Sequence, residues 1–376
     1  MIALDQLKDT TLNLATNLRG WKTRRRLLVI ESDDWGATRM PGRDAWKKLI
    51  DAGIRVDHCR YDSLDCLENR DDFQALMNVI DRHLDASGRP ATFTFNTVMG
   101  NPDFDAIERE AFERFHHQHF FEAYQHYYGE DLESDWKRAM QAGLICPQFH
   151  GREHLNVPLW MRDLKAGQHE TRLAFRHRFY GLTTKTSSVR QVNYLAAFWA
   201  ESAADLQSAF QRLADGLLLF RRTFGYSSRT FIACNYILPE QAQAVLQDHG
   251  VLMLQGQRGQ FVPRGEGSGG RVERVFTGKY SAGGLLRTVR NVRFEPFEDD
   301  SANCVGSALK QIQQSFACRK PAIVSSHRVN YVSGMNLKHR DRSLRSLDSL
   351  LSQVRRRWPD VEFLSSDQLL EEMTNS

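Results

Sequence analysis

The stretch LLVIESDDWG, Leu27 to Gly36, is an apolar run that ends on two adjacent carboxylates, Asp33 and Asp34. Four aliphatic residues in a row, two of them β-branched, predict a buried strand. Two negative charges side by side at the end of such a strand repel each other, and a bound cation would relieve that repulsion. The stretch therefore predicts a buried strand that ends on two charges, whose compensation has to come from elsewhere in the chain or from a bound cation.

Further short apolar runs recur between longer amphipathic stretches. This alternation is typical of βα units around a largely parallel sheet or barrel, so we predict an α/β fold. The strands expected after the first are 91–96, 144–149, 230–235, 251–255, 321–326 and 361–366. The clearest helices are 43–52, 202–224 and 239–249, the last of which begins with proline and ends before glycine.

Two segments interrupt this alternation. Residues 103–141 are rich in aromatic residues and histidines and predict a helical insertion before the next strand. Residues 263–284 combine glycine and charge without periodicity, which predicts a long loop insertion.

Polar residues follow three of the predicted strands. HGREH places His150 and His154 four residues apart directly after the strand 144–149, and SSH places His327 after the strand 321–326. If a helix starts at His150, the two imidazoles lie on one face, about 5–6 Å apart at Cβ. The carboxyl ends of parallel strands meet at one rim of an α/β barrel, so these histidines and Asp33–Asp34 are expected at one mouth.

That set is chemically coherent. Two neutral imidazoles and one carboxylate suit Zn²⁺ or another divalent cation and leave a coordination position open for water. A second carboxylate and a third histidine would then serve as base and acid. The competing interpretations are that Asp33–Asp34 forms a turn or helix cap and that His327 is structural. A second metal site at His116, His117, His119 and His126 is a weaker alternative to a packed aromatic helix.

ESDDWG resembles the paired-aspartate motif of the polysaccharide deacetylase family (NodB-like, carbohydrate esterase family 4), and HGREH and SSH resemble that family's histidine motifs. The resemblance implies a distorted (β/α)7 barrel, with residues 1–376 forming a single catalytic domain. It implies Asp33 as general base and His327 as general acid. Asp34, His150 and His154 would be the metal ligands.

The family also uses a backbone amide of a tyrosine motif to stabilise the oxyanion, and FIACNYILP is the nearest match, which implicates Tyr236. Trp35, Arg152 and Asn235 are predicted to bind the substrate. Two features of the family are missing. No arginine stands in the tyrosine motif, where Arg229 lies a few residues upstream, and VLMLQGQRG replaces an aspartate-tryptophan motif.

The composition sets few further limits. The formal net charge is +4, and no nucleic-acid motif accompanies it, so nucleic acid is not expected as a partner. The six cysteines contain no C-x-x-C pair, and no apolar run reaches the length of a membrane span. We expect a cytoplasmic protein with reduced thiols, and the sequence predicts no oligomeric state.

The function predicted from these patterns is metal-dependent removal of an N-acetyl group from an amino sugar or polysaccharide precursor, with an acetylated carbohydrate as substrate. Two alternatives stay open. One is O-deacetylation of a sugar, because the metal chemistry is indifferent to the acyl acceptor. The other is a catalytically inactive, carbohydrate-binding barrel, which the missing arginine and aspartate-tryptophan motifs favour.

Overall fold

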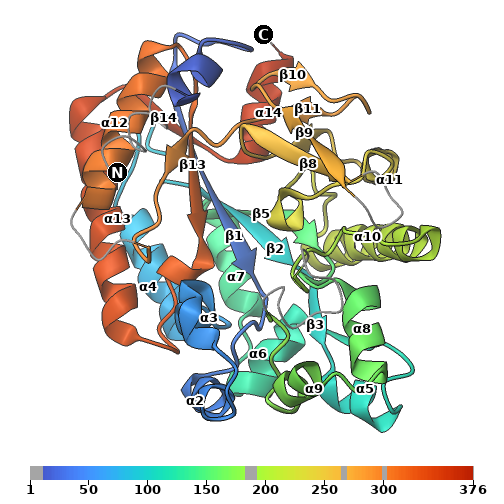
Figure 1. Cartoon of the computed structure of the whole chain (residues 1–376). Coiled ribbons are helices and arrows are strands. Elements are labelled where there is room, and N and C mark those ends of the chain that lie inside the picture. The colour runs from blue at the N-terminus through green and yellow to red at the C-terminus, as the bar shows by residue number, and fades with distance from the viewer. Residues whose placement is uncertain (1–11, 183–192, 264–268, 299–302, 376) are drawn as a thin grey trace.

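A curled and largely parallel sheet forms the centre of the molecule, with helices packed around it (Figure 1). The computed structural model describes residues 12–182, 193–263, 269–298 and 303–375. The strand order is β10-β11-β7-β6-β5-β2-β1-β13-β12, with β14 also paired to β1. Every pair is parallel except β10 and β11. The predicted α/β fold is confirmed, as a curled sheet whose end strands do not pair within the described residues.

All seven predicted strands are present. They are β1 (Arg26–Trp35), β2 (Phe93–Val98), β5 (Ile145–Gly151), β6 (Thr230–Phe231), β7 (Met253–Leu254), β13 (Ala322–His327) and β14 (Val361–Leu364). Three further short strands of the sheet were not predicted, namely β10 (Lys279–Tyr280), β11 (Leu286–Arg287) and β12 (Val292–Arg293). Strands of two residues carry too little periodicity to be recognised in a sequence.

Strand β1 lies at the middle of the sheet and fixes the position of the paired aspartates. Its residues Leu28 to Asp33 pair with β13, which puts Asp33 opposite His327. On its other edge β1 pairs first with β14, over Arg26–Val29, and then with β2 from Ile30 onward. β14, the last of the predicted strands, therefore pairs with the same edge of β1 as β2 does.

The helices cover the sheet on both sides (Figure 1). Their bounds are α2 (Arg43–Asp51), α3 (Arg60–Leu64), α4 (Arg70–Ile80), α5 (Phe104–Arg109), α6 (Phe120–Tyr128), α7 (Glu133–Gln141), α8 (Val157–Lys165), α9 (His169–Arg176), α10 (Ala203–Phe224), α11 (Ala242–Asp248), α12 (Asn303–Ala317), α13 (Leu337–Arg357) and α14 (Ser366–Thr374). The helices predicted over 43–52 and 202–224 are confirmed. The third is shorter than predicted and begins at Ala242.

The segment 103–141 is helical as predicted, but it is part of the main core. It holds α5 to α7 and a short strand, β4 (His117–His119), which pairs with β3 (Gly100–Pro102). Phe120, Tyr124 and Trp136 are fully buried in the main hydrophobic cluster. These aromatic residues pack on one another and, through Trp136, on Phe95 of β2, which stabilises the fold.

The expectation of a long loop over 263–284 is wrong. Residues Gly270–Arg274 form β9, which pairs antiparallel with β8 (Gly259–Pro263), and β10 extends the main sheet. Residues 264–268 of the predicted loop lie outside the described residues. Cross-strand pairing and not sequence periodicity specifies this hairpin.

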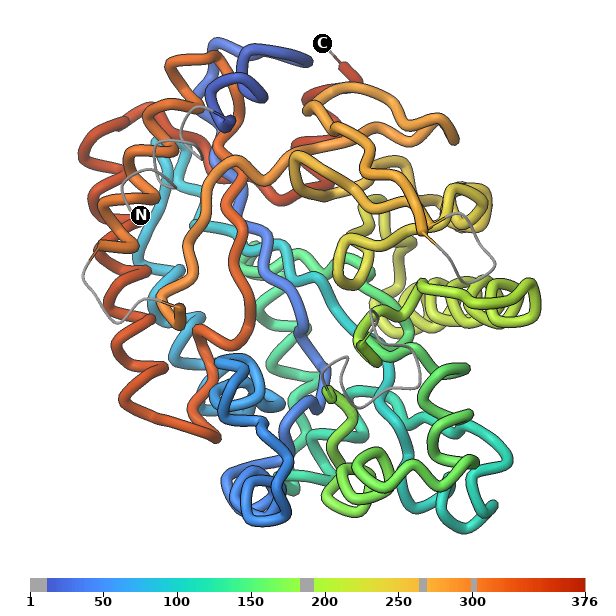
Figure 2. The backbone as a smooth tube through the Cα atoms, in the orientation of Figure 1, coloured from blue at the N-terminus to red at the C-terminus, as the bar shows by residue number. Residues whose placement is uncertain are grey.

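The two ends of the described chain lie side by side at one end of the molecule (Figure 2). Arg25 forms ion pairs with Glu362 and Glu372. Asn17 accepts a hydrogen bond from Asn291. Within the described residues no helix is long and apolar enough to cross a membrane.

Candidate active site

Asp34 stands at the end of β1 in an unusual backbone conformation. Its φ is 74°, and the pairing of β1 with β2 shifts register between Ser32 and Trp35. Such irregularities re-aim a side chain at the end of a strand. Oδ1 of Asp34 lies 3.5 Å from Nε2 of His150 and 3.6 Å from Nε2 of His154.

His150 and His154 meet without a helix between them, so the expectation of a helical H-x-x-x-H pair is wrong. His150 belongs to β5, whereas His154 lies in the turn that precedes α8. Gly151 makes this turn possible, because its φ of 133° is one that other residues rarely adopt. The ring centroids are 5.1 Å apart.

The two imidazoles offer their Nε2 atoms toward Asp34. His150 donates its Nδ1 hydrogen to the carbonyl of Ile232 at 2.9 Å, which leaves the Nε2 lone pair free. Burial lowers the pKa of His154 to about 3, so this ring is neutral at physiological pH. Its Nδ1 is buried and has no hydrogen-bond partner within the described residues. Two imidazole nitrogens and a carboxylate oxygen are a donor set that fits a divalent cation.

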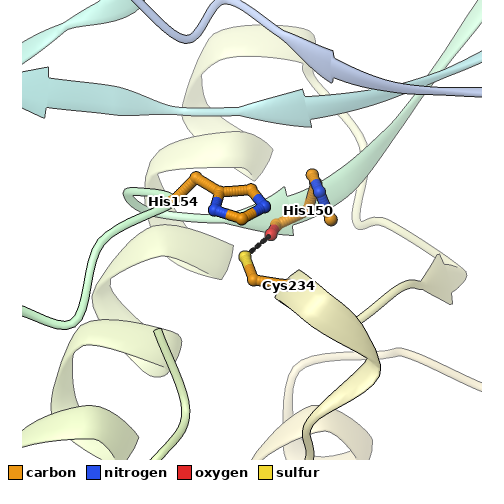
Figure 3. A group of neighbouring side chains, drawn as sticks. All are labelled: His150, His154 and Cys234. Carbon is orange, nitrogen blue, oxygen red and sulfur yellow. Dashed lines mark hydrogen bonds between the residues drawn. The ribbon is translucent and has the colours of Figure 1, made fainter. Parts of the chain in front are cut away.

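A buried thiol that the sequence analysis did not consider stands beside this set. Cys234 donates a hydrogen bond to the backbone carbonyl of His150 at 3.2 Å (Figure 3). Ligand atoms of Cys234, His150 and His154 lie within 4.8 Å of one another. Among the described residues this is the group of histidine, cysteine and carboxylate side chains close enough to hold a metal ion, and it includes none of the four histidines between 116 and 126.

Asp33 is held by an arginine far away in the sequence. Arg290 donates to both carboxylate oxygens of Asp33, at 2.6 and 2.7 Å, and to Glu31 at 2.7 Å. Asn96 donates a third hydrogen bond to Asp33 at 2.7 Å. Burial raises the pKa of a carboxyl group, but Arg290 outweighs this effect and lowers the pKa of Asp33 to about 2. Asp33 is therefore ionised throughout the physiological pH range.

The tyrosine motif has no arginine, and Arg290 makes the contact with Asp33 instead. Arg229, the arginine upstream of that motif, lies at the surface and pairs with Glu371. Arg290 lies between β11 and β12, in the run LLRTVRNVRF. In the sequence, the signal for a paired Arg290 was its place inside a short apolar run, where an arginine is uncommon unless its charge is paired.

His327 forms a second buried pair. Its Nδ1 lies 2.6 Å from Oε1 of Glu295, and its Nε2 lies 3.6 Å from Oδ2 of Asp33. Burial alone would lower the pKa of His327, but Glu295 outweighs it and raises the pKa to about 9. His327 is therefore an imidazolium at neutral pH. Glu295 supplies a carboxylate that sequence reasoning missed, and Asn330 holds its other oxygen.

Tyr236 reaches the site by its side chain. Its hydroxyl accepts a hydrogen bond from Arg290 at 3.2 Å, and its backbone amide donates to the carbonyl of Ala233 at 2.9 Å. The amide is thus already used inside the turn, which contradicts the expectation that it stabilises an oxyanion. Asn235, which precedes it, is exposed and has a positive φ of 54°.

A cavity of about 710 Å³ connects these groups. Seven of the predicted site residues line it: Asp33, Asp34, His150, His154, Asn235, Tyr236 and His327. Two do not. Trp35 is buried in a stack on Phe95, with 3.7 Å between the ring centroids. Arg152 turns away to form ion pairs with Glu153 and Asp215.

Comparison with known proteins finds resemblance only among solved structures. No family model and no curated protein matches the sequence. A putative polysaccharide deacetylase from Mycobacterium smegmatis is 12% identical, with a TM-score of 0.42 over 95% of this chain and 93% of that chain. The Puue allantoinase is 9% identical, with a TM-score of 0.47 over 95% and 93% of the two chains.

A carbohydrate esterase family 4 pseudoenzyme from Bacillus anthracis, BA3943, is 9% identical, with a TM-score of 0.35 over 94% of this chain and 67% of that chain. The family that the sequence motifs resemble is thus represented among the matched structures. All three TM-scores are below 0.5.

Proposed function

We propose that this protein is a metal-dependent deacetylase that removes an N-acetyl group from an amino sugar or a polysaccharide precursor. The observation that carries the proposal is the register of β1 and β13, which sets Asp33 beside His327. The next residue, Asp34, directs its Oδ1 to the Nε2 atoms of His150 and His154. A base, an acid and a set of cation ligands thus meet in one cavity.

The ligand set proposed for the cation is Asp34, His150 and His154, with Zn²⁺ or another divalent ion as the occupant. Cys234 has its sulfur within 4.8 Å of ligand atoms of the two histidines and is a candidate for a further ligand. A divalent ion held there would polarise the acetyl carbonyl and lower the pKa of a water molecule.

The remaining chemistry falls to two buried pairs. Asp33 is ionised and oriented by Arg290, so its carboxylate is ready to take a proton from the attacking water. His327 is protonated because of Glu295 and can give its proton to the leaving amine. The two groups lie 3.6 Å apart, so both can contact the same substrate group. The Tyr236 hydroxyl, next to Arg290, is placed to contact the same substrate.

These pairs also bear on the inactive alternative. That alternative was favoured by the missing arginine and the missing aspartate-tryptophan motif. Arg290 holds Asp33 and Glu295 holds His327, each from a position outside those motifs, which supports turnover. O-deacetylation would use the same groups, because His327 can protonate an alkoxide as well as an amine.

The test is an acetate-release assay on N-acetylated and O-acetylated amino sugars with the Zn²⁺-loaded protein. Asp33→Asn is expected to keep the metal and lose most of its activity, whereas His150→Ala is expected to lose both. Metal content is measured on the same samples. If the purified protein binds no divalent ion, or if Asp33→Asn is fully active, the proposal fails.

A further inference from the structure

A buried arginine in the cavity wall has no part in the chemistry described above. Arg39 is 8% exposed and lines the same cavity as the catalytic groups. Its φ of 42° is unusual for a residue with a side chain. Within the described residues its guanidinium makes no hydrogen bond, and Nε is buried without an acceptor.

Arg39 forms two long ion pairs, with Asp34 and with Asp65. Asp34 Oδ2 lies 3.5 Å from the guanidinium, but Oδ1 of the same group faces the two histidines. Asp65 Oδ2 lies 3.9 Å away, while Arg328 donates to both oxygens of Asp65 at 3.1 Å. Both ion pairs are long and Nε has no acceptor, and a buried guanidinium donor that stays unpaired is costly. Its open hydrogen bonds therefore suggest a ligand.

A third carboxylate, Asp62, also lines this part of the cavity. It forms no ion pair with Arg39 within 4 Å among the described residues, and burial raises its pKa to about 7. Asp62 therefore competes weakly for the guanidinium.

The other cavity arginines are held differently from Arg39. Arg290 forms short ion pairs with Asp33 and Glu31, and Arg293 is paired with Glu298 at the surface. Arg258 also has an interaction within the chain. Among the cavity arginines of the described chain, Arg39 is the one with a buried guanidinium nitrogen that has no hydrogen-bond partner.

Tyr61 connects Arg39 to the proposed acid. The Arg39 guanidinium carbon lies 5.0 Å from the centre of the Tyr61 ring, and the His327 ring lies 5.5 Å from it on edge. Arg39 and His327 thus both lie against the Tyr61 ring, which brings a group bound at Arg39 close to His327. That proximity suits a substituent on the same sugar whose acetamido group contacts Asp33 and His327.

We infer that Arg39 binds an anionic substituent of the substrate, a carboxylate or a phosphate carried by the acetamido sugar. Guanidinium pairs with both groups through two parallel hydrogen bonds. The inference rests on the proposed function, since it places the sugar against Asp33 and His327. It restricts the substrate to acidic amino sugars or sugar phosphates, whereas neutral amino sugars would bind weakly.

Binding of deacetylated sugars tests this without turnover. We would measure the affinity of glucosamine, glucosamine 6-phosphate and muramic acid for the Zn²⁺-loaded protein by calorimetry. At least one anionic sugar should bind about 10-fold or more tightly than glucosamine. Arg39→Gln should abolish that preference, and Arg39→Lys should keep part of it. Arg293→Gln, which changes the arginine paired with Glu298, is the matched control and should keep it in full.

The outcomes separate the inference from the proposed function. Tighter binding of the phosphate or of the carboxylate identifies the substituent. Equal binding of neutral and anionic sugars overturns the inference, as does a preference that survives Arg39→Gln. Acetate release from neutral sugars that is indifferent to Arg39 leaves the function standing without the inference. An Arg39-dependent preference without acetate release from any acetylated sugar leaves the inference standing without the function.

Discussion

Arg290 and Glu295 each hold a proposed catalytic group from a distant position in the chain. Arg290 donates to Asp33 and to Glu31, and Glu295 pairs with His327. Each pair is buried, so water does not weaken it and its charges depend on each other. Removing one partner leaves the other charge buried without compensation, which makes these residues sensitive test positions.

Arg290→Gln should lower the rate of acetate release by about 100-fold or more, because Asp33 loses the two hydrogen bonds that fix its orientation. Arg229→Gln is the matched control. It breaks only a surface ion pair with Glu371 and should change the rate little. Metal content should be normal in both variants. A full loss in Arg229→Gln with a normal rate in Arg290→Gln would reverse our assignment.

Glu295→Gln should shift the alkaline limit of activity. In the wild-type protein His327 loses its proton as the pH rises through about 9, so activity should fall there. Without Glu295, burial lowers the pKa of His327, and activity should already fall near neutral pH. Rates measured between pH 6 and 10 test this, and an unchanged alkaline limit would show that His327 is not the acid.

The same pair predicts a dependence of stability on pH. The pKa of folded His327 is raised above its ordinary value of 6.5, so its contribution to stability is complete below pH 6.5. This contribution is lost as the pH rises through about 9. Urea unfolding at pH 6 and pH 9.5 should show a smaller difference for Glu295→Gln than for the wild-type protein.

At the scale of elements, the sequence predicts what depends on periodicity. The apolar run Leu27–Ile30 and the amphipathic stretch 203–224 appear as β1 and α10. The two-residue strands β11 and β12 and the hairpin of β8 and β9 depend on pairing partners elsewhere in the chain. Arg290 was missed for this reason, because its contact with Asp33 spans 257 residues.

Two glycines in helix interiors should respond oppositely to alanine. A Cβ at Gly216 of α10 would stand 2.7 Å from the ring of Phe149 and 2.8 Å from Cβ of Arg152. These two residues lie on either side of His150 in the chain. Gly216→Ala should therefore destabilise the protein by about 1–3 kcal/mol. At Gly306 of α12 the nearest atom is 3.6 Å away, and Gly306→Ala should stabilise it by about 0.5–1 kcal/mol.

Urea unfolding of the two glycine variants measures both changes. Gly216→Ala should also weaken metal binding, because α10 packs on the end of β5 where His150 stands. A stabilised Gly216→Ala protein with normal metal affinity would show that helix and strand have room to separate.

At the scale of the whole molecule, the proposed site depends on strands that are distant in sequence. Asp34, His150 and His327 stand at the ends of β1, β5 and β13, so the cavity exists only when the sheet has formed. The candidate ligand types could be predicted from sequence, because residues at the carboxyl ends of parallel strands converge. The buried pairs that set their charges could not, since no local pattern records a partner across the sheet.

Because the unfolded chain cannot bring these ligands together, a bound divalent ion should stabilise the fold. At a free Zn²⁺ concentration 100 times the dissociation constant the gain is about 2.7 kcal/mol, or about 3 °C in Tm for a chain of this size. Adding a chelator should remove that gain. Asp33→Asn should keep the Zn²⁺-dependent shift and His150→Ala should lose it, because only His150 belongs to the proposed ligand set. Thermal scans with Zn²⁺ and with chelator measure the shift. A wild-type protein whose Tm is the same in both would show that Asp34, His150 and His154 do not form a metal site.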